Sequence, residues 1–238
     1  MMKRFIFSIF LLPLLLASPQ TKAQGIMLTP KWTAQAQFTG YYVADKLGFY
    51  KEEGIDVCVQ HPAISESSFS FMEKGRAPVV IMNLSYAFME RLAGARVVNV
   101  MQTSQENSLM LISHSPLKGE ESLRNQKIAV WNHLSQKLLD RLAEHYALKQ
   151  VEWIRFNSGV NVFLSGAADP CLVGSYNEYL QLSEYGMNVD SIYSIRLADY
   201  GYNLPEDGLY VTEEFYNQYP EVVRKLVKAS MRGWAWTN

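Results

Sequence analysis

Two groups of aromatic and polar side chains could hold a flat ligand. Trp32 and Phe38 lie in a polar loop after a short apolar run, and aromatic side chains of this kind stack on unsaturated rings. In the second group, the carboxylate of Glu178 follows Tyr176 and Asn177 and can accept hydrogen bonds from a ring N–H and an amino group. These residue types predict a neutral or weakly basic planar ligand. Structural roles stay open, because a lone tryptophan is often a core residue and Glu178 could be an exposed glutamate at a helix start.

The elements that must position the first group are predicted by the segment 32–59. Val43, Leu47 and Tyr50 are spaced as one face of a short helix, and Gly48 and Gly54 then interrupt the pattern. The alternating run 55–59 predicts a strand. A strand, loop, helix and strand in this order leave an open loop at the carboxyl end of the first strand, where open α/β sheets bind ligands.

The same alternation of strands and helices continues along the chain and predicts an α/β fold with two doubly wound lobes. Lobe 1 is expected over 24–112 plus 199–238, and lobe 2 over 113–198, with the apolar run 109–112 as a crossover strand. Two crossings between the lobes form a two-segment hinge, and such an arrangement closes on a small ligand. The expected strands are 55–59, 78–82, 97–103, 127–131, 151–155 and 168–173, and the expected helices are 67–74, 86–93, 136–145, 160–165, 178–185, 213–219 and 221–236.

The run W-x(5)-F-x-G-Y-Y-V-A-x(3)-G-F-Y-x-x-E-G-I-D-V over 32–57 resembles the NMT1/THI5-like substrate-binding proteins. Further segments in the matching order are 115–130, 164–169 with 176–179, 199–201, 213–220 and 232–234. The resemblance implies the type II periplasmic-binding-protein architecture, an ABC transporter permease as partner, and a thiamin pyrimidine precursor as ligand. Family members generally continue with further helices, so it also implies that lobe 1 is C-terminally shortened or belongs to a longer protein.

Positions after the strands, together with the resemblance, indicate which residues bind the ligand. Asn83 and Ser85 stand where the family more usually has an acidic residue, which weakens that inference, and Ser85 could simply cap the next helix. The full set of expected ligand-binding residues is Trp32, Phe38, Tyr41, Asn83, Ser85, Trp131, Tyr176, Asn177, Glu178 and Tyr200.

Composition narrows the function classes. Residues 1–23 have a basic start, an apolar run and small residues before Gln24, which predicts a cleavable signal peptide and a periplasmic location. An uncleaved membrane anchor is the alternative, although the apolar run is short for a membrane span. Without this leader the formal charge falls from −1 to −4, so nucleic acid is not expected as a partner. The four histidines lack metal-binding spacing, and no metal or cofactor is expected. Cys58 and Cys171 are expected to be small buried residues, with a disulfide in an oxidising compartment as the alternative.

Alternative functions remain at this stage. A receptor for a sulfonate or nitrate would have the same fold, although an anion favours Arg, Lys and helix N-termini over aromatic rings and a glutamate. A periplasmic sensor module of a signalling protein is another alternative. Fungal members of the group synthesise the pyrimidine with pyridoxal phosphate and a cysteine-rich run; here only Cys171 stands in that half of the chain, so an enzyme is the least favoured interpretation.

Overall fold

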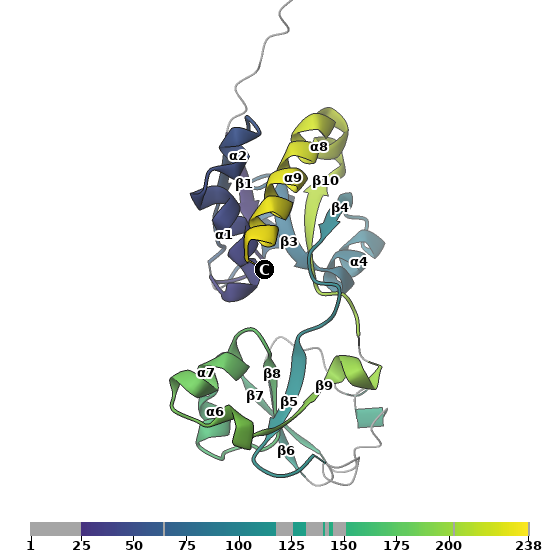
Figure 1. The fold of residues 1–238 in the computed structure, drawn as a ribbon. Coiled ribbons are helices and arrows are strands. Elements are labelled where there is room, and N and C mark those ends of the chain that lie inside the picture. Colours follow the sequence, from purple (N-terminus) through teal and green to yellow (C-terminus); the bar gives the residue numbers. More distant parts are fainter. Residues whose placement is uncertain are drawn as a thin grey trace, which may run out of the picture.

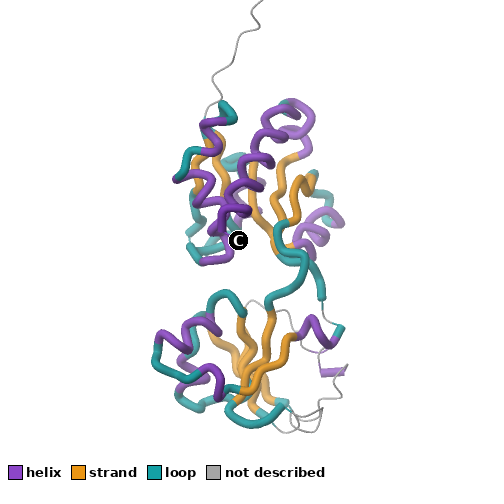
Figure 2. Tube along the Cα trace, viewed as in Figure 1, coloured by secondary structure: helices purple, strands orange, loops and turns teal. Residues whose placement is uncertain are grey.

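The computed structural model describes residues 25–63, 65–117, 126–131, 140, 143–144, 151–201 and 203–237. Within these residues the chain forms two lobes, each built on a five-stranded mixed sheet (Figure 1). Two chain segments connect the lobes, as Figure 2 shows in the loop colour between the upper and lower sheets. The predicted α/β fold with two lobes is therefore confirmed.

The first sheet has the strand order β2-β1-β3-β10-β4. Its strands are β1 (Ile26–Thr29), β2 (Val57–Val59), β3 (Val79–Asn83), β4 (Val97–Gln102) and β10 (Asp207–Thr212). Strand β1 is parallel to β2 and β3, whereas β10 is antiparallel to both β3 and β4. The helical segments of this lobe are η1 (Ala36–Phe38), α1 (Thr39–Lys46), α2 (Phe49–Glu52), α3 (Ser68–Glu73), α4 (Leu84–Leu92), α8 (Glu213–Gln218) and α9 (Pro220–Thr237).

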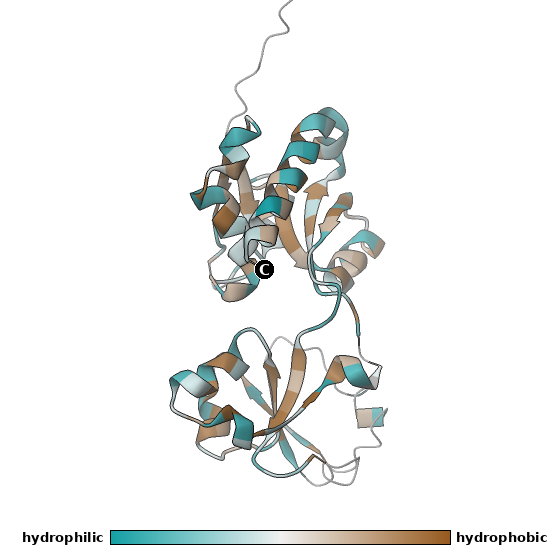
Figure 3. Cartoon of the chain, in the orientation of Figure 1, coloured by the Kyte–Doolittle hydropathy of each residue, from teal (hydrophilic) through white to brown (hydrophobic). Residues whose placement is uncertain are grey.

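Helix α9 packs directly on α1, and two glycines make this close approach possible. A Cβ atom added to Gly233 would lie 1.9 Å from the carbonyl oxygen of Gly40, and one added to Gly40 would lie 2.3 Å from the Trp234 ring. Tyr41 and Phe38 are fully buried beneath this contact, in the same cluster as Leu226. In Figure 3 the hydrophobic residues of both lobes concentrate on the strands and on the helix faces that cover them.

The second sheet has the order β7-β6-β8-β5-β9. Its strands are β5 (Leu109–Ser113), β6 (Lys127–Trp131), β7 (Glu152–Phe156), β8 (Cys171–Gly174) and β9 (Tyr193–Arg196). The helical segments of this lobe that lie wholly within the described residues are α6 (Asn161–Leu164), α7 (Glu178–Glu184), η3 (Val189–Ser191) and η4 (Leu197–Tyr200). Strand β8 is antiparallel to β5 and parallel to β6, so the carboxyl ends of β6 and β8 lie at the edge where β5 begins.

The two crossings are joined to each other by hydrogen bonds. Ser108 Oγ donates to Glu206 Oε2 over 2.9 Å, and the Asn107 backbone N–H donates to Asn203 Oδ1 over 3.1 Å. The Gln102 amide donates to the carbonyl oxygen of Asp207 over 3.0 Å. Because these bonds connect residues far apart in sequence, the two hinge segments are tied together beside the first sheet.

The structure differs from the sequence-based expectations in a few elements. The run 109–112 pairs with β8 and β9, so it belongs to the second sheet and the first crossing lies before it. Strand β10, at the interior of the first sheet, was not predicted. Cys58 is exposed, contrary to the expectation, whereas Cys171 is buried, and both are free. The leader 1–23 and most of the expected helix 136–145 fall outside the described residues.

Candidate functional site

The predicted site residues lie at the hinge-facing edges of the two sheets. Asn83 ends β3 and pairs with Asp207, the first residue of β10 after the second crossing. Gly174 ends β8 and pairs with Leu109, the first residue of β5 after the first crossing. Carboxyl ends of strands from both lobes therefore point toward the same hinge, and Figure 1 shows these two edges opposite each other. In α/β proteins such edges carry the ligand-binding loops.

At the edge of the first sheet, Lys31 and Asp207 form a buried ion pair. Lys31 Nζ lies 2.7 Å from Asp207 Oδ1, and the side chains are 9% and 5% exposed. The same ammonium group donates to Asn83 Oδ1 over 2.5 Å, so the ends of β1, β3 and β10 are connected through one cation. The second oxygen of Asp207 accepts a hydrogen bond of 2.7 Å from the Gln37 amide.

Trp32 is held by this network at its edge and at one face. Its indole N–H donates to Gln37 Oε1 over 3.0 Å, and Lys31 Nζ lies 4.0 Å from the ring centroid. His61 Nδ1 donates to the carbonyl oxygen of Trp32, and His61 Nε2 accepts the Tyr42 hydroxyl over 2.7 Å. The ring is partly buried and packs against the core of the first lobe, which is consistent with either a structural role or a stacking platform.

At the edge of the second sheet, Glu178 is a buried carboxylate. It is 6% exposed and begins α7, which follows the end of β8. Its Oε2 accepts the Gly174 backbone N–H over 3.1 Å, and its Oε1 accepts the indole N–H of Trp131 over 3.2 Å. A carboxylate has about four acceptor positions, so the two donors among the described residues use only part of its capacity. The exposed helix-start alternative for Glu178 is wrong, because the side chain is buried.

Tyr176 is influenced by acidic groups of both lobes. Burial raises the pKa of Tyr176 strongly, and the negative charges of Glu206, Asp207 and Glu178 raise that pKa further. A hydrogen bond between Tyr176 and Ser108 acts in the opposite direction. Burial also raises the pKa of the Glu206 carboxyl, although the Lys31 charge and the Ser108 hydrogen bond oppose this rise. Tyr176 is therefore within electrostatic reach of three carboxylates.

The other predicted residues lie in several environments. Phe38 and Tyr41 are fully buried in the core of the first lobe rather than at its edge. Ser85 is an exposed residue within α4, whose N-cap is Asn83, so the alternative that Ser85 only caps this helix is wrong. Asn177 Oδ1 accepts the Gln181 amide of α7 over 3.0 Å. Tyr200 ends η4 beside the return crossing.

Much of the first-sheet edge is formed by residues that were not predicted as ligand-binding: Lys31, Gln37, Glu206 and Asp207. Lys31 and Gln37 flank the predicted Trp32 in the same loop, so polar residues beside the aromatic platform were the available signal. Glu206 and Asp207 precede the apolar run Leu209-Tyr-Val211, which could have indicated an additional strand with acidic residues at its start.

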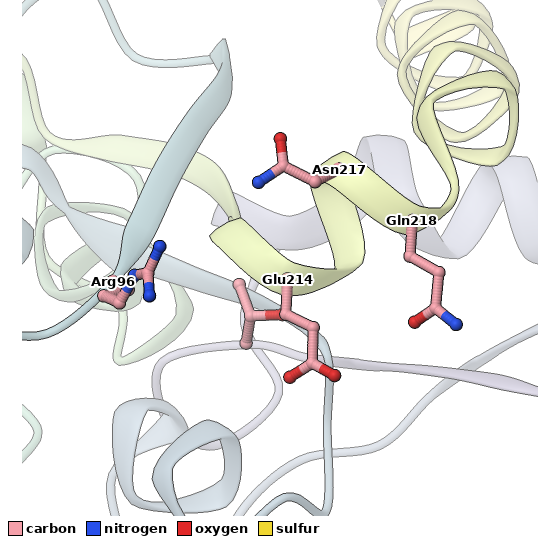
Figure 4. Close-up of a pocket in the computed structure, with 5 residues that line it drawn as sticks. Arg96, Glu214, Asn217 and Gln218 are labelled. Carbon is pink, nitrogen blue, oxygen red and sulfur yellow. The ribbon is translucent and has the colours of Figure 1, made fainter.

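A surface pocket lies at the opposite edge of the first sheet. Its lining residues come from the start of β4, the end of β10 and helix α8: Arg96, Thr212, Glu214, Asn217 and Gln218 (Figure 4). Because β10 runs from Asp207 at the hinge to Thr212, this pocket is separated from the candidate site by the length of that strand. Within the described ranges, no group of three or more His, Cys, Asp or Glu side chains could hold a metal ion.

Two α/β lobes on a double crossing, with aromatic and polar side chains at the facing edges, define a protein of the type II periplasmic-binding-protein fold. The periplasmic aliphatic sulphonate binding protein SsuA of Escherichia coli is similar, with a TM-score of 0.68 and 13% identity over 90% of this chain and 74% of that chain. The family described as NMT1/THI5 like matches residues 35–238, and the chain belongs to this family.

Curated relatives fall into binding proteins and synthases. A riboflavin-binding protein of Chloroflexus aurantiacus is 29% identical over 92% of this chain and 64% of its own length. A 4-amino-5-hydroxymethyl-2-methylpyrimidine phosphate synthase of Saccharomyces cerevisiae is 22% identical over 83% of this chain and 62% of its own length. A formylaminopyrimidine-binding protein of Halalkalibacterium halodurans is 24% identical over 99% of this chain and 75% of its own length. The chain thus spans less than two thirds of the length of the first two relatives.

No helix within the described residues is both long enough and apolar enough to cross a bilayer.

Proposed function

We propose that this chain is the extracytoplasmic solute-binding component, or the solute-binding portion, of an ABC importer. Its ligand is a small planar nitrogen heterocycle of the aminopyrimidine type, held between the hinge-facing edges of the two lobes. The partner that receives the ligand is the permease of the importer. The predicted signal peptide supports delivery to the periplasm, and intact-mass analysis of the exported protein tests this: a chain beginning near Gln24 is expected, and a membrane-bound chain that retains Met1 contradicts it.

The buried charges at the candidate site indicate which class of ligand it binds. The negative charges of Glu178, Glu206 and Asp207 all raise the pKa of Tyr176, so this part of the site has a negative potential. In the described part of the chain, Lys31 is the one cationic side chain that forms an ion pair with any of these carboxylates, and its partner is Asp207. Glu178 and Glu206 accept hydrogen bonds from neutral groups. A ligand that offers N–H donors, or carries a proton, would compensate this negative potential, whereas a sulfonate or nitrate would be repelled by it.

The shape of the ligand follows from the aromatic side chains at the same edges. Trp32 and Tyr176 come from the first and second lobes respectively, and each stands next to a carboxylate network. A ring stacked on either side chain could direct its amino and ring N–H groups toward Glu178 or Glu206. Such pairing selects an amino-heterocycle over an apolar ring of the same shape, because the apolar ring would leave a buried carboxylate without its donor.

The names of the relatives support a binding protein more than an enzyme. Two binding proteins, for riboflavin and for formylaminopyrimidine, match a larger share of this chain than the yeast synthase does. Both named ligands are planar nitrogen heterocycles, and the smaller of the two is the type proposed here. The sulfonate-binding neighbour shares the fold at 13% identity, which supports the architecture and not the ligand.

A thermal-shift screen followed by calorimetric titration tests the proposal. The exported protein is screened against 4-amino-5-hydroxymethyl-2-methylpyrimidine, riboflavin and ethanesulfonate, since a ligand that binds only the folded state raises the melting temperature. We expect stabilisation by the aminopyrimidine and none by the sulfonate. Stabilisation by ethanesulfonate alone would refute the ligand class, and a response to riboflavin alone would replace the aminopyrimidine by a larger heterocycle.

Trp32→Ala tests the stacking platform in the same titration. We expect binding of the aminopyrimidine to weaken by about 1–3 kcal/mol, from lost contact area and lost stacking. Trp236→Ala is the matched control, because Trp236 is 65% exposed near the end of α9. If Trp32→Ala lowers the melting temperature but leaves the affinity of the folded protein unchanged, Trp32 is a core residue only.

A further inference from the structure

We propose that Lys31 and Asp207 are positioning residues that hold the Trp32 ring in a fixed orientation at the end of β1. The inference deepens the proposed function, because it names the groups that prepare the first lobe for a planar ligand. Its positioning part concerns the protein without ligand and stands independently of which ligand binds. Neither residue needs to contact the ligand for this role.

The anchor of the arrangement is the carboxylate of Asp207. Its backbone is fixed in the interior of the first sheet, where the residue pairs with Asn83 and its carbonyl oxygen accepts the Thr103 hydroxyl over 2.7 Å. Its side chain is 5% exposed and uses both oxygens, one for Lys31 and one for Gln37, each over 2.7 Å. A carboxylate held in this way has a defined direction, so the groups bound to it are directed as well.

Gln37 transmits that direction to the indole. An amide has donors on its nitrogen and acceptors on its oxygen, so its orientation depends on its partners. Because Asp207 can only accept when ionised, it holds the Gln37 NH₂ group toward itself, and this leaves Gln37 Oε1 facing the Trp32 N–H at 3.0 Å. A neutral side chain in place of Asp207 would allow the amide to turn over, and the indole N–H would then meet a donor.

Lys31 restrains the ring from its face. Its ammonium group lies 4.0 Å from the centroid of the Trp32 ring while it is bound to Asp207 and Asn83. Trp32 is thus restrained at its edge by Gln37 and at one face by Lys31, and both restraints converge on one carboxylate. A buried ion pair generally contributes little net stability compared with apolar side chains of similar size, so its main effect here is on geometry.

Fluorine NMR of the full chain labelled with 5-fluorotryptophan tests the positioning directly. The sequence has five tryptophans, and Trp32→Phe assigns the Trp32 resonance by its loss. In Asp207→Asn and in Lys31→Met, without ligand, we expect the Trp32 resonance to shift and broaden while the resonances of Trp153 and Trp236 stay in place. Glu66→Gln is the matched control, because it removes the carboxylate from an exposed ion pair with Lys74 and Arg76.

A Trp32 resonance that is unchanged in both variants would overturn the proposal. If Asp207→Asn unfolds the lobe and all resonances collapse, Gln37→Met decides the question, because it removes only the amide between Asp207 and the indole. An unchanged Trp32 resonance in Gln37→Met would then overturn the proposal.

Titration with 4-amino-5-hydroxymethyl-2-methylpyrimidine forms the second arm. We expect Asp207→Asn to weaken binding roughly tenfold, because the Trp32 ring is no longer held in place; this is the size of effect that the loss of one charge-assisted hydrogen bond has. Glu66→Gln should leave the affinity unchanged. Failure of the parent protein to bind any of the screened heterocycles would refute the proposed function, while the ligand-free spectra would still decide the positioning role. An altered Trp32 resonance with an unaltered affinity would refute the link between positioning and binding.

Discussion

Replacing Glu178 with glutamine tests the central acidic group of the candidate site, and the structure allows its cost to be worked out. Among the described residues, the carboxylate accepts one hydrogen bond on each oxygen, from the Gly174 N–H and from the Trp131 indole N–H. Glutamine has only one acceptor oxygen, so its NH₂ group must face one of these two donors. A buried donor left in this state costs about 1–3 kcal/mol, so we expect the free energy of unfolding to fall by that amount.

Ligand binding is expected to fall as well, for a different reason. A hydrogen bond to a charged group contributes about 1.5–3 kcal/mol, which corresponds to roughly 10- to 150-fold in the dissociation constant. Glu178→Gln removes the charge that an amino-heterocycle would pair with. The same change reduces the repulsion of an anion, so affinity for ethanesulfonate, if any is measurable, should stay the same or rise.

The assay separates the two effects by measuring stability and affinity on the same samples. Urea unfolding gives the loss of stability, and calorimetry at a temperature where the variant is fully folded gives the affinity for each ligand. Glu184→Gln is the matched control, because Glu184 is an exposed glutamate at the other end of α7. A variant that is less stable but binds the aminopyrimidine as tightly as the parent would refute a role in binding and leave Glu178 as a structural residue.

Two further predictions concern the first lobe. Gly233→Ala should lower the free energy of unfolding by about 1–3 kcal/mol in urea titrations, because its Cβ would lie 1.9 Å from the Gly40 carbonyl oxygen and α9 would have to move away from α1. The control Met231→Ala, on the exposed side of α9, should change the free energy of unfolding by less than about 0.5 kcal/mol. Equal effects of the two substitutions would contradict the close contact between the helices. Burial raises the pKa of Glu206, so the folded protein keeps the carboxyl proton to higher pH than the unfolded chain does. Ionisation of Glu206 therefore lowers the free energy of unfolding as pH rises from the ordinary carboxyl pKa toward the raised pKa of the folded state. The stability gained by Glu206→Gln should therefore be small in acid and grow toward neutral pH in unfolding experiments, and a gain that is the same at every pH would show that Glu206 titrates normally.

The α/β fold was predictable because its signals are local. The segment 43–50 is helical as predicted, but Gly48 divides it into α1 and α2. The expected helix face is wrong, because Leu47 is 47% exposed whereas Tyr41 and Ala44 are buried. The alternation along 55–59 depends on neighbouring residues, and strand β2 lies there. The same holds for Lys127–Trp131 and for the helix that begins at Glu178. These periodicities, with the family pattern, were sufficient for two lobes and for the loop that carries Trp32.

The position of strand β10 in the sheet could not be predicted from local sequence signals. Its residues Asp207–Thr212 lie between β3 and β4 and antiparallel to both, although they follow those strands by more than a hundred positions. Pairing at such a separation is decided by which sheet edge is open once the other strands have packed. The sequence therefore contained the apolar run but not its place in the sheet.

The residues of the candidate site also fall into two groups, those predicted from neighbours along the chain and those brought together by folding. Local sequence was enough to predict that Trp32 follows a first strand and that Glu178 starts a helix beside Tyr176, because each statement concerns neighbours along the chain. Three other features became visible only once the chain was folded. Lys31 meets Asp207 across 176 positions, Trp131 donates to Glu178, and Tyr41 is buried under α9. A hydrogen bond or a buried face depends on distance in space, and that distance is determined by how the sheets and helices pack.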